Sequence, residues 1–485
     1  MNSFLSIVQA VNNAVWSTPL IALCLLAGIY FSVRMKFPQV RLFKEMINLL
    51  LDKDKSENGV TPFQAFATTV GGRVGVGNIA GVATAIYYGG PGAIFWMWMI
   101  AFLGAGSAFV ESSLAQAYKT KISGEYVGGP AYFIEQGIGK KWYAVLFAIC
   151  TILAPGVLMP GAQTYNIVAS VNSAFGVNVY ITGLIICVLL GLVIFGGVKR
   201  IGKTAEVVAP FMSLAYVLIA LLVIIFNIKK LPGVIALIFT SAFGANQAFG
   251  AIIGTAIAWG VKRGVYSNEA GQGSGAIVSA AAECTHPAKQ GLVQAFSVYV
   301  DTLLVCSATA FMILLTGSYN VADGVGGFIA ENAPGISFGV EYTQVAVDSV
   351  FSGFGSPFIA ISVFLFAFTS LMSYYYQAES NMSYLFPGNK NAKLIMRIIF
   401  IIAAFSGVVN TGEFIWTFGD LGVGLMAWLN IIAILILSGK GIKILKDYEE
   451  QIGKGIEPYF EPDKFNILDN ENVWRKNRQI NQNEN

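Results

Sequence analysis

The sequence predicts an all-α polytopic membrane protein with about eleven transmembrane helices, built as a 5+5 inverted repeat with two broken helices plus one extra N-terminal helix. Three observations predict this fold class. Hydrophobic residues make up 55% of the 485 residues and charged residues only 12%, which is typical of chains that fold in a lipid bilayer. Apolar runs of about 20 residues, the length that crosses a bilayer, recur along the chain. Two of these runs are interrupted by glycine and lie five helices apart.

The apolar runs divide the chain into four parts. Residues 1–60 hold the extra N-terminal helix and a cytoplasmic loop, 61–233 the first repeat, 234–438 the second repeat and 439–485 a polar cytoplasmic tail. Because five helices is an odd number, the second repeat enters the membrane from the opposite side. The expected spans are 14–34, 61–88, 91–118, 143–171, 179–197, 204–227, 234–262, 291–317, 355–386, 393–410 and 413–438.

Lysine and arginine are distributed unevenly between the two sets of loops. If the N-terminus lies outside, nearly all of the 30 basic residues fall in cytoplasmic loops and the tail. The exceptions are Arg73, inside a span, and Lys229 and Lys230 on the outer side. The long outer loop at about 318–354 contains acidic residues but no lysine or arginine. The positive-inside rule therefore predicts a multi-pass protein of the cell (plasma) membrane with its C-terminus in the cytoplasm.

The first interrupted run is TTVGGRVGVGNIAGV at 68–82. Each interior glycine costs a helix about 1 kcal/mol relative to alanine, so a run this rich in glycine is expected to break in mid-membrane. Non-helical backbone at that depth must be buried in protein or line a cavity, because its N–H and C=O groups need partners. The freed backbone groups are then available to a ligand.

The second interrupted run contains SAFGANQAFG at 241–250, inside the expected span 234–262. A pair of glycine-interrupted segments at matching places in two halves is typical of an inverted-repeat secondary transporter with its binding site between them. We therefore expect both breaks to face one site near the middle of the membrane.

Three long strings resemble the alanine or glycine:cation symporter family, also called the sodium:alanine symporter family. They are TTVGGRVGVGNIAGVATAIYYGGPGAIFWMW, which begins at residue 68, SNEAGQGS at 267–274, and HPAKQGLVQAFSVYVDTLLVC at 286–306. The resemblance covers about residues 60–438 and implies cotransport of a small amino acid with sodium. The shorter string GGRVGVGNI is similar to the first helix of leucine-transporter-type symporters, which implies that the break contributes to sodium and substrate binding.

The candidate substrate site follows from a missing charge. No acidic residue lies in 68–82, so a zwitterionic amino acid is favoured: its carboxylate would meet backbone N–H groups and its ammonium would meet amides. Bulky phenylalanines would limit the ligand to glycine, alanine or serine. The candidates are Gly75, Gly77, Asn78, Gln163, Asn166, Phe243, Asn246, Gln247 and Phe249. Equally, the amides could make ordinary interhelical hydrogen bonds and the phenylalanines could be ordinary packing residues.

The resemblance to leucine-transporter-type symporters also implies a sodium site. It points to carbonyl oxygens of one helix and hydroxyls of another, at Gly71, Val74, Phe366, Thr369 and Ser370. Five oxygens without a carboxylate suit a weakly bound monovalent cation. The alternative is that the adjacent Thr369 and Ser370 only back-bond to carbonyls of their own helix.

Ionisable residues inside spans are functional candidates because a charge is costly in a bilayer. Arg73 is either the counter-charge of a gate, paired with Asp301 or Glu111, or a structural neutraliser of one buried acid. We expect Glu269 to brace the region after the second interrupted helix and His286 to be a surface residue. The full set is Arg73, Glu111, Glu206, Asp301, Glu379, Glu413 and Asp420.

These features predict a sodium-coupled symporter that imports alanine and/or glycine by alternating access, with sodium as the co-transported ion. The alternatives are a proton-coupled amino-acid transporter and, less favoured, an ion channel. The spans contain no Cys–His pair, HExxH or Ser-Lys arrangement, so an enzyme is not expected. The expected partners are the amino acid, sodium and the lipid bilayer, with no nucleic acid and no obligate protein partner.

Overall fold

The computed structural model describes residues 2–50, 59–469 and 473–474. Within these residues, eight helices are long and apolar enough to cross a membrane. They are Phe4–Arg34, Gly92–Ala117, Lys141–Phe175, Gly197–Phe226, Pro287–Thr316, Gly355–Leu385, Lys390–Val409 and Gly412–Ile436, with a shorter apolar helix at Val179–Ile194. The all-α polytopic fold class is therefore confirmed, whereas the count of eleven spans stays a prediction.

The first half of the chain runs to residue 226 and contains one hairpin of antiparallel strands, β1 (Thr120–Ile122) and β2 (Glu125–Val127). Its helices and helical turns are α1 Asn2–Val15, α2 Thr18–Arg34, α3 Pro38–Arg41, α4 Phe43–Leu50, α5 Pro62–Arg73, η1 Val76–Asn78, α6 Ala80–Gly89, α7 Gly92–Ala117, α8 Pro130–Phe133, η2 Ile134–Ile138, α9 Lys141–Leu153, η3 Ala154–Leu158, α10 Pro160–Phe175, α11 Val179–Ile194 and α12 Gly197–Phe226.

The second half contains a second antiparallel hairpin, β3 (Asn320–Ala322) and β4 (Phe328–Glu331). Its helices and helical turns are η4 Ile228–Lys230, α13 Leu231–Ala242, η5 Gly250–Ile252, α14 Ile253–Asn268, α15 Ser274–Ala280, α16 Pro287–Val298, η6 Tyr299–Cys306, α17 Ser307–Thr316, α18 Val340–Asp348, α19 Gly355–Leu385, α20 Lys390–Val409, α21 Gly412–Ile436, α22 Ser438–Gly453 and η7 Pro462–Phe465.

The first interrupted helix lies where the sequence predicts it. Helix α5 begins with a capping box, in which Thr61 and Gln64 each accept a hydrogen bond from the other's backbone N–H, and Pro62 occupies its first turn. The helix ends at Arg73, a single turn η1 follows, and α6 continues from Ala80. The expected break within 68–82 is confirmed.

The second interruption lies elsewhere than predicted. Residues 241–250 span the end of α13 and the turn that leads through η5 to a separate helix, α14, with Gly244 at a φ of +71°. The break inside the second helix falls between α14 and α15, where Glu269, Gly271 and Gly273 all have positive φ. The predicted span 234–262 and its break at 241–250 are therefore wrong. Glycine ends helices in exposed turns as well as in mid-membrane, so glycine content alone could not separate the two cases.

The corrected break gives the two halves the same order of elements. A broken helix followed by four helical segments occurs first as α5–α6, α7, α9–α10, α11 and α12. It occurs again as α14–α15, α16–α17, α19, α20 and α21. This order agrees with an inverted repeat, and the domain limits 61–233 and 234–438 stay predictions.

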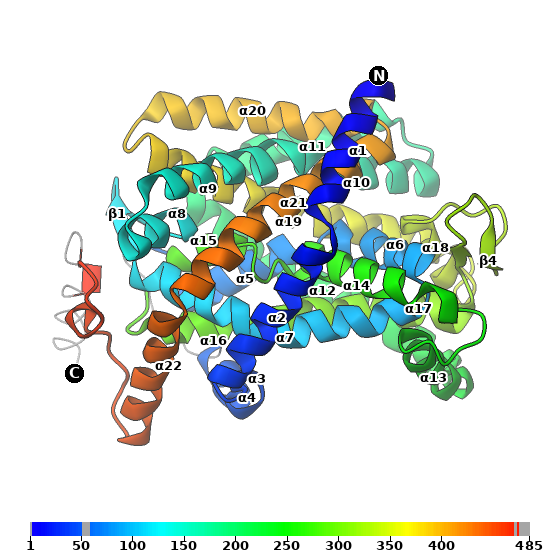
Figure 1. Ribbon diagram of the computed structural model, residues 1–485. Coiled ribbons are helices and arrows are strands. Elements are labelled where there is room, and N and C mark those ends of the chain that lie inside the picture. Colours follow the sequence, from blue (N-terminus) through cyan, green and yellow to red (C-terminus); the bar gives the residue numbers. More distant parts are fainter. Residues whose placement is uncertain (1, 51–58, 470–472, 475–485) are drawn as a thin grey trace.

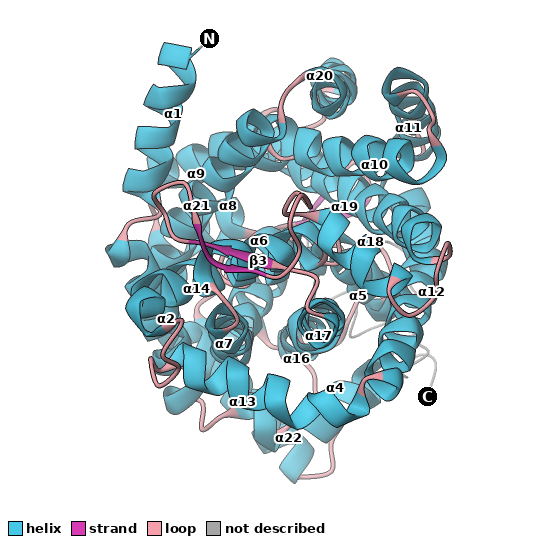
Figure 2. Cartoon of the chain, turned by 90° about the vertical axis from the view of Figure 1, so that its right-hand side faces the viewer, coloured by secondary structure: helices cyan, strands magenta, loops and turns pink. Residues whose placement is uncertain are grey.

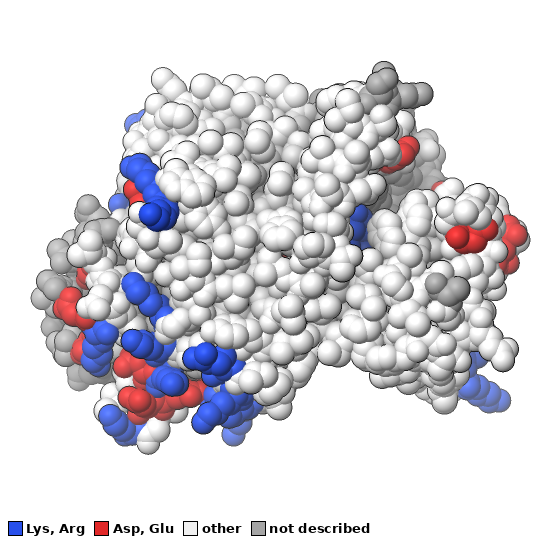
Figure 3. Space-filling view, viewed as in Figure 1, with Lys and Arg blue, Asp and Glu red and all other residues white. Residues whose placement is uncertain are grey.

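Helix α7 packs against α2, α14 and α16, and Figures 1 and 2 show it running beside α2 and α14. Helix α12 lies at the periphery, and its side chains Val207, Phe211, Leu214 and Leu218 are all more than half exposed. Because these positions fall on one helical face, that face forms an apolar stripe suited to lipid. Figure 3 shows a broad face almost free of charge, with lysine and arginine gathered at the end where α4 and α22 lie.

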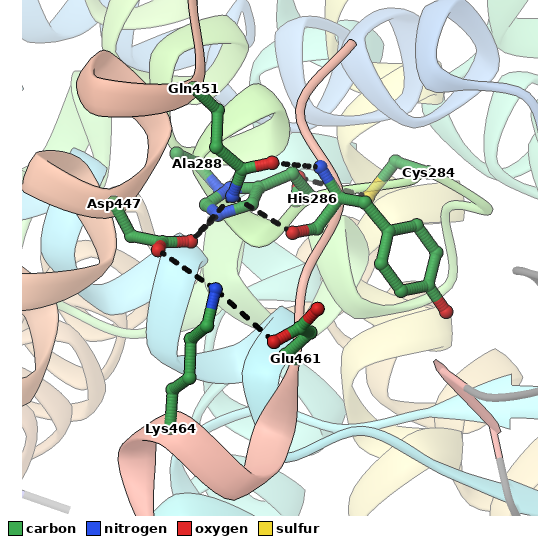
Figure 4. Close-up of polar contacts among 8 residues, drawn as sticks. Cys284, His286, Ala288, Asp447, Gln451, Glu461 and Lys464 are labelled. Atoms are coloured by element: carbon green, nitrogen blue, oxygen red, sulfur yellow. Dashed lines mark hydrogen bonds and ion pairs between the residues drawn. The ribbon is translucent and has the colours of Figure 1, made fainter. Parts of the chain in front are cut away.

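The tail after α21 folds back onto the body of the protein. The backbone N–H of Phe460 donates to the carbonyl of Thr285 over 3.0 Å. His286, predicted to be a surface residue, is fully buried: its Nε2 lies 3.2 Å from Asp447 Oδ2 and its Nδ1 accepts from the Ala288 N–H (Figure 4). The prediction was wrong because the sequence around His286 is that of a polar loop. The tail, which lies far away in the sequence, packs over this loop and buries the histidine. Residues 470–472 and 475–485 of the predicted tail lie outside the described residues.

Candidate functional site

The break between α5 and α6 is held open by side-chain amides. The Gly75 N–H donates to Asn78 Oδ1 over 2.8 Å, and the Val76 N–H donates to Gln163 Oε1 over 3.2 Å. Both amide groups therefore replace helical partners that the break removes. The structure brings together four predicted substrate residues, namely Gly75, Gly77, Asn78 and Gln163, and all are buried.

Asp301 joins this break to the second half of the chain. Its carboxylate, on the π-helical segment η6, accepts from Asn78 Nδ2 over 2.6 Å and from the hydroxyls of Ser267 and Thr302 over 3.0 and 2.7 Å. Ser267 is in the last turn of α14, directly before the second break. The carboxylate is fully buried, and within the described residues it forms no ion pair with a lysine or arginine. We call Asn78, Ser267, Asp301 and Thr302 the junction cluster.

Asp301 was not predicted to belong to the substrate or sodium site; the sequence indicated it as an intramembrane acid and a candidate partner of Arg73. The position of this carboxylate depends on η6 lying beside both breaks, which periodicity does not reveal. The signal that could have found it was its place in the third family-like string at 286–306.

The second break is supported by two side chains from other helices. The Gly273 N–H donates to Glu111 Oε2 over 3.1 Å, and Asn430 Nδ2 donates to the same oxygen and to the Gly271 carbonyl. Glu269 accepts from the Ser274 hydroxyl over 2.6 Å. Glu269 thus braces this break, as predicted, although the break is the second interruption itself rather than a region after it.

Arg73 lies at the end of α5 and is buried. Its Nη1 donates to the Gln294 carbonyl over 3.0 Å and to the Ser297 hydroxyl, both on α16. Among the described residues it forms no ion pair with Asp301 or Glu111, the partners that the sequence suggested. In this arrangement Arg73 ties the first break to α16 by hydrogen bonds.

The candidate sodium residues meet where α19 crosses the end of α5. The Ser370 hydroxyl donates toward the carbonyls of Gly71 and Phe366 over 3.2 and 3.1 Å, and Thr369 donates to the Phe366 carbonyl over 2.9 Å. Four of the predicted residues are therefore in contact, and Val74 follows α5 directly. Thr369 also bonds to the carbonyl of Leu365 in its own helix, so the back-bonding alternative is realised in the same geometry.

Four predicted substrate residues do not reach this site. Phe243 is 59% exposed and packs against Phe95, while Asn246 Oδ1 accepts from N–H groups of its own turn. Gln247 is exposed, and Phe249 packs near Gly90 at the far end of α6. Helix α6 separates these residues from Asn78 by ten residues, or about 15 Å. The expectation that residues 241–250 face the central site was therefore wrong.

Asn166 lines a separate cavity of about 700 Å³ between α1, α6, α10, α14 and α21, which we call the vestibule. Figure 2 looks onto the end of the molecule where these helices meet, and Figure 3 shows a hollow with basic atoms in the right half. Further lining residues are Tyr88, Trp259, Lys262, Arg263, Trp416 and Asp420. Gly75, Gly77 and Asn78 do not line it, so the vestibule and the break are distinct spaces in this structure.

Known proteins resemble this chain over nearly its whole length. The family model described as "Sodium:alanine symporter family" matches residues 1–462. Protein YrbD of Bacillus subtilis (strain 168) is 53% identical over 471 residues, which cover 97% of each chain. The sodium/proton-dependent alanine carrier protein of Bacillus sp. (strain PS3) is 49% identical over 436 residues, covering 88% of this chain and 97% of that protein.

Among solved structures, the manganese transporter of Eremococcus coleocola aligns with a TM-score of 0.54 over 79% of this chain and 80% of that one, at 13% identity. This likeness shows a shared fold and nothing about the ligand. The match over nearly the whole chain, together with two relatives near half identity, establishes that the chain belongs to the sodium:alanine symporter family, a family of transporters and not of enzymes.

Proposed function

We propose that this protein is a symporter that couples sodium entry to the import of a small neutral amino acid, alanine and/or glycine, by alternating access. Support for cation coupling and for alanine comes from the family and from the printed name of the Bacillus sp. relative. The observation that carries the mechanism is the junction cluster, a buried polar centre that contacts both broken helices. Interrupted helices around one buried polar centre are the arrangement from which alternating-access carriers are built.

We place the substrate at the first break. The N–H groups of Gly75 and Val76 are held by the amide oxygens of Asn78 and Gln163, which can turn away and leave donors for a carboxylate. Residues 68–82 contain no acidic side chain, so Asp301 supplies the negative charge that would bind the ammonium group. The packing favours a small ligand, because a Cβ on Gly77 would lie 3.3 Å from Tyr266 Cδ1.

We place the sodium ion between α5 and α19, at the carbonyls of Gly71, Val74 and Phe366 and the hydroxyls of Thr369 and Ser370. Each hydroxyl now donates a hydrogen bond toward a carbonyl. Rotation of the hydroxyls would turn their lone pairs inward and leave an all-oxygen shell without a carboxylate. Such a shell suits a monovalent cation that must be released on the other side.

Proton coupling is the second candidate, and Asp301 favours it. A buried carboxylate without a basic partner in the described chain is costly unless a cation or a proton accompanies it. The printed name of the Bacillus sp. relative includes both ions. An ion channel has no such support, because the vestibule does not continue into the first break.

The test is uptake of radiolabelled alanine into proteoliposomes under separate sodium and pH gradients. One charge moving through 100 mV supplies about 2.3 kcal/mol, which is roughly fiftyfold in accumulation. We expect accumulation with an inward sodium gradient, and competition by unlabelled glycine but not by glutamine or leucine. Accumulation driven only by a pH gradient, and lost in Asp301→Asn, would instead favour proton coupling; the absence of any driven uptake would overturn both.

We also propose that the end bearing α4 and α22 faces the cytoplasm and that the vestibule opens to the outside. The concentration of lysine and arginine at that end supports this orientation (Figure 3). In this orientation the N-terminus lies outside the cell membrane and α22 lies inside.

A further inference from the structure

The two broken helices are joined to each other at the end of the molecule that bears α4 and α22. Val60 lies just before α5, and its N–H donates over 3.1 Å to the carbonyl of Ala281, just after α15. The Glu283 N–H donates back to the Val60 carbonyl, also over 3.1 Å. A Cβ on Gly59 would lie 2.3 Å from the Ala281 oxygen, so the two segments are in close contact. Helices α5 and α15 cannot separate at this end while these contacts hold.

The loop between α15 and α16, residues 281–286, is bound by α7 and by the tail. Gln116 Nε2, in the last turn of α7, and Lys119 Nζ, just after it, both donate to the Ala282 carbonyl, over 3.0 and 2.8 Å. The tail binds the end of the loop: the Phe460 N–H donates to the Thr285 carbonyl over 3.0 Å. Two separate parts of the chain therefore hold this loop in its present position.

Glu457 of the tail adds two side-chain contacts next to that backbone bond. It forms an ion pair with Lys289, in the first turn of α16, and its Oε1 accepts from the Thr285 hydroxyl over 3.4 Å. The tail therefore holds the end of the loop and the start of α16 at the same time.

His286 of the loop is enclosed by side chains of the tail. Its ring centre lies 5.3 Å from that of Tyr448 on α22 and 5.7 Å from that of Phe460. Tyr448 and Phe460 are 1% and 0% exposed. Asp447 lies against the edge of the same histidine ring (Figure 4). Burial of these rings stabilises the docked tail, because it removes apolar surface from water.

The docked segment can leave the loop without unfolding α22. Between residues 454 and 469 the described tail contains one helical turn, η7, so its order depends on the contacts it makes. The side chain of Glu457 is 70% exposed, and an exposed ion pair is weak and screened by salt. Helix α22 has its own contact with the neighbouring α3, through an ion pair of 2.6 Å between Glu449 and Arg41.

We propose that residues 454–469 form an autoinhibitory latch. Docked on the loop between α15 and α16, they keep α5 and α15 together at this end, and they must undock before the central site opens there. This inference rests on the alternating access that we propose as the function. Secondary carriers alternate by moving one group of helices against another around a fixed site. A segment that ties down the loop after one broken helix opposes that motion, so its release limits the rate of transport.

The first experiment measures the separation of α5 from α15 directly. Thr69 of α5 is 1% exposed, and a Cβ on Gly275 of α15 would lie 3.4 Å from its Cγ2. In Thr69→Cys the new thiol should react with N-ethylmaleimide only when the two helices part. In lipid nanodiscs, deletion of residues 454–485 should speed this reaction by about threefold to tenfold, the weight of one neutral hydrogen bond in an equilibrium. Protein without Thr69→Cys corrects for the native cysteines. Ile456→Ala, exposed in the same segment, is the matched control and should not change the rate.

The second experiment measures uptake of radiolabelled alanine into proteoliposomes. The deletion should raise the maximal rate by the same factor, with less than a threefold change in the alanine concentration for half-maximal uptake, because it removes no residue of either proposed site. In the full-length variant Thr285→Cys/Glu457→Cys, a short thiol cross-linker with cleavable disulfides should lower uptake at least tenfold. Dithiothreitol should restore it. Each single-cysteine variant, treated in the same way, should keep its uptake.

The outcomes separate the latch from the proposed function. If the deletion changes neither the labelling rate nor uptake, or if the cross-linked chain transports alanine at the full rate, the latch is overturned and the proposed function stands. If the wild-type chain shows no driven uptake, the proposed function falls, whereas the labelling rates still decide whether the tail holds α5 and α15 together. If the shortened chain is not monodisperse, the labelling rate of Thr69→Cys before and after cross-linking of the full-length chain decides: an unchanged rate would overturn the latch.

Discussion

Several residues at the centre of this transporter are glycine because a side chain would collide with a neighbouring helix. A Cβ placed on Gly75 would lie 2.3 Å from the Ser370 hydroxyl, and one on Gly77 would lie 3.3 Å from the Cα of Ser267. These close approaches let α5–α6 contact both α19 and α14 at the break. The same glycines expose the backbone N–H groups that Asn78 and Gln163 now hold.

Replacing Gly75 or Gly77 by Leu should abolish alanine binding while the protein still inserts, because the side chain would fill the site. Gly191→Leu on α11 is the control: its nearest neighbour to an added Cβ is 3.9 Å away, so binding should persist. Gly250→Leu should also bind alanine, since that turn lies far from the first break. Binding is measured on monodisperse protein, and near wild-type affinity in Gly75→Leu would remove the first break from the site.

The double variant Thr369→Ala/Ser370→Ala should raise the sodium concentration needed for half-maximal uptake at least tenfold. The reason is that both hydroxyls are assigned to the ion and neither to the amino acid. The relative inhibition by glycine, serine and glutamine should stay the same. Sodium activation of uptake at fixed alanine is the measurement, and an unchanged activation curve would move the ion to another site, such as Asn78.

At the scale of elements, the two broken helices and the tail make the contacts that hold the central region together. Each break is supported by side chains from other helices: Gln163 at the first, and Glu111 and Asn430 at the second. The tail reaches the loop after α15 through His286 and Asp447, with Lys464 and Gln451 on the same carboxylate (Figure 4). Contacts between the tail and this loop therefore connect α22 to the segment just after the second break.

Docking of the tail should weaken as the pH falls below about 6.5. Burial lowers the pKa of His286 below its usual value, against the opposing influence of Asp447. An exposed histidine titrates near 6.5, so below that pH the undocked state binds more protons than the docked state, and stability is lost toward acid. Because one histidine titrates, the equilibrium constant for docking of the tail should fall by at most tenfold for each pH unit.

Hydrogen exchange measures this docking at the Phe460 N–H, which bonds to the Thr285 carbonyl. After correction for intrinsic exchange, its protection should fall between pH 7.5 and 5.5. Asp447 adds little in this range: His286 and Lys464 outweigh its burial and lower the pKa of its carboxyl, so its own contribution is lost only in stronger acid. His286→Gln should remove the pH effect. If the variant lost as much protection between pH 7.5 and 5.5 as the wild-type protein, the pH effect would belong to a group other than His286.

At the scale of the whole molecule, the two ends differ in charge and the broad face between them is apolar. This distribution supports the orientation that we propose, with α22 in the cytoplasm. A cysteine placed at Val325, which is 90% exposed between β3 and β4, should react with a membrane-impermeant maleimide in intact cells. A cysteine at Lys446, exposed on α22, should react only after permeabilisation. The opposite pattern would invert the topology.

The sequence by itself determined the membrane class, the first broken helix and the set of basic loops. Each depends on a local property: the length of an apolar run, glycine inside such a run, or the charge of a loop. It also placed Gly75, Gly77, Asn78 and Gln163 at one site, and Gly71, Phe366, Thr369 and Ser370 at another, with help from the family resemblance.

Only the tertiary structure decided which glycine-rich segment is the second break and which acid serves the first. Residues 241–250 and 269–273 are both glycine-rich, and they differ in that Glu111 and Asn430, distant in sequence, support the backbone of the second alone. Asp301 and His286 gain their surroundings from segments that lie beside them: the junction cluster for one, the tail for the other. A freed backbone group or a buried charge is stable only when another part of the chain satisfies it, and the fold determines which part that is.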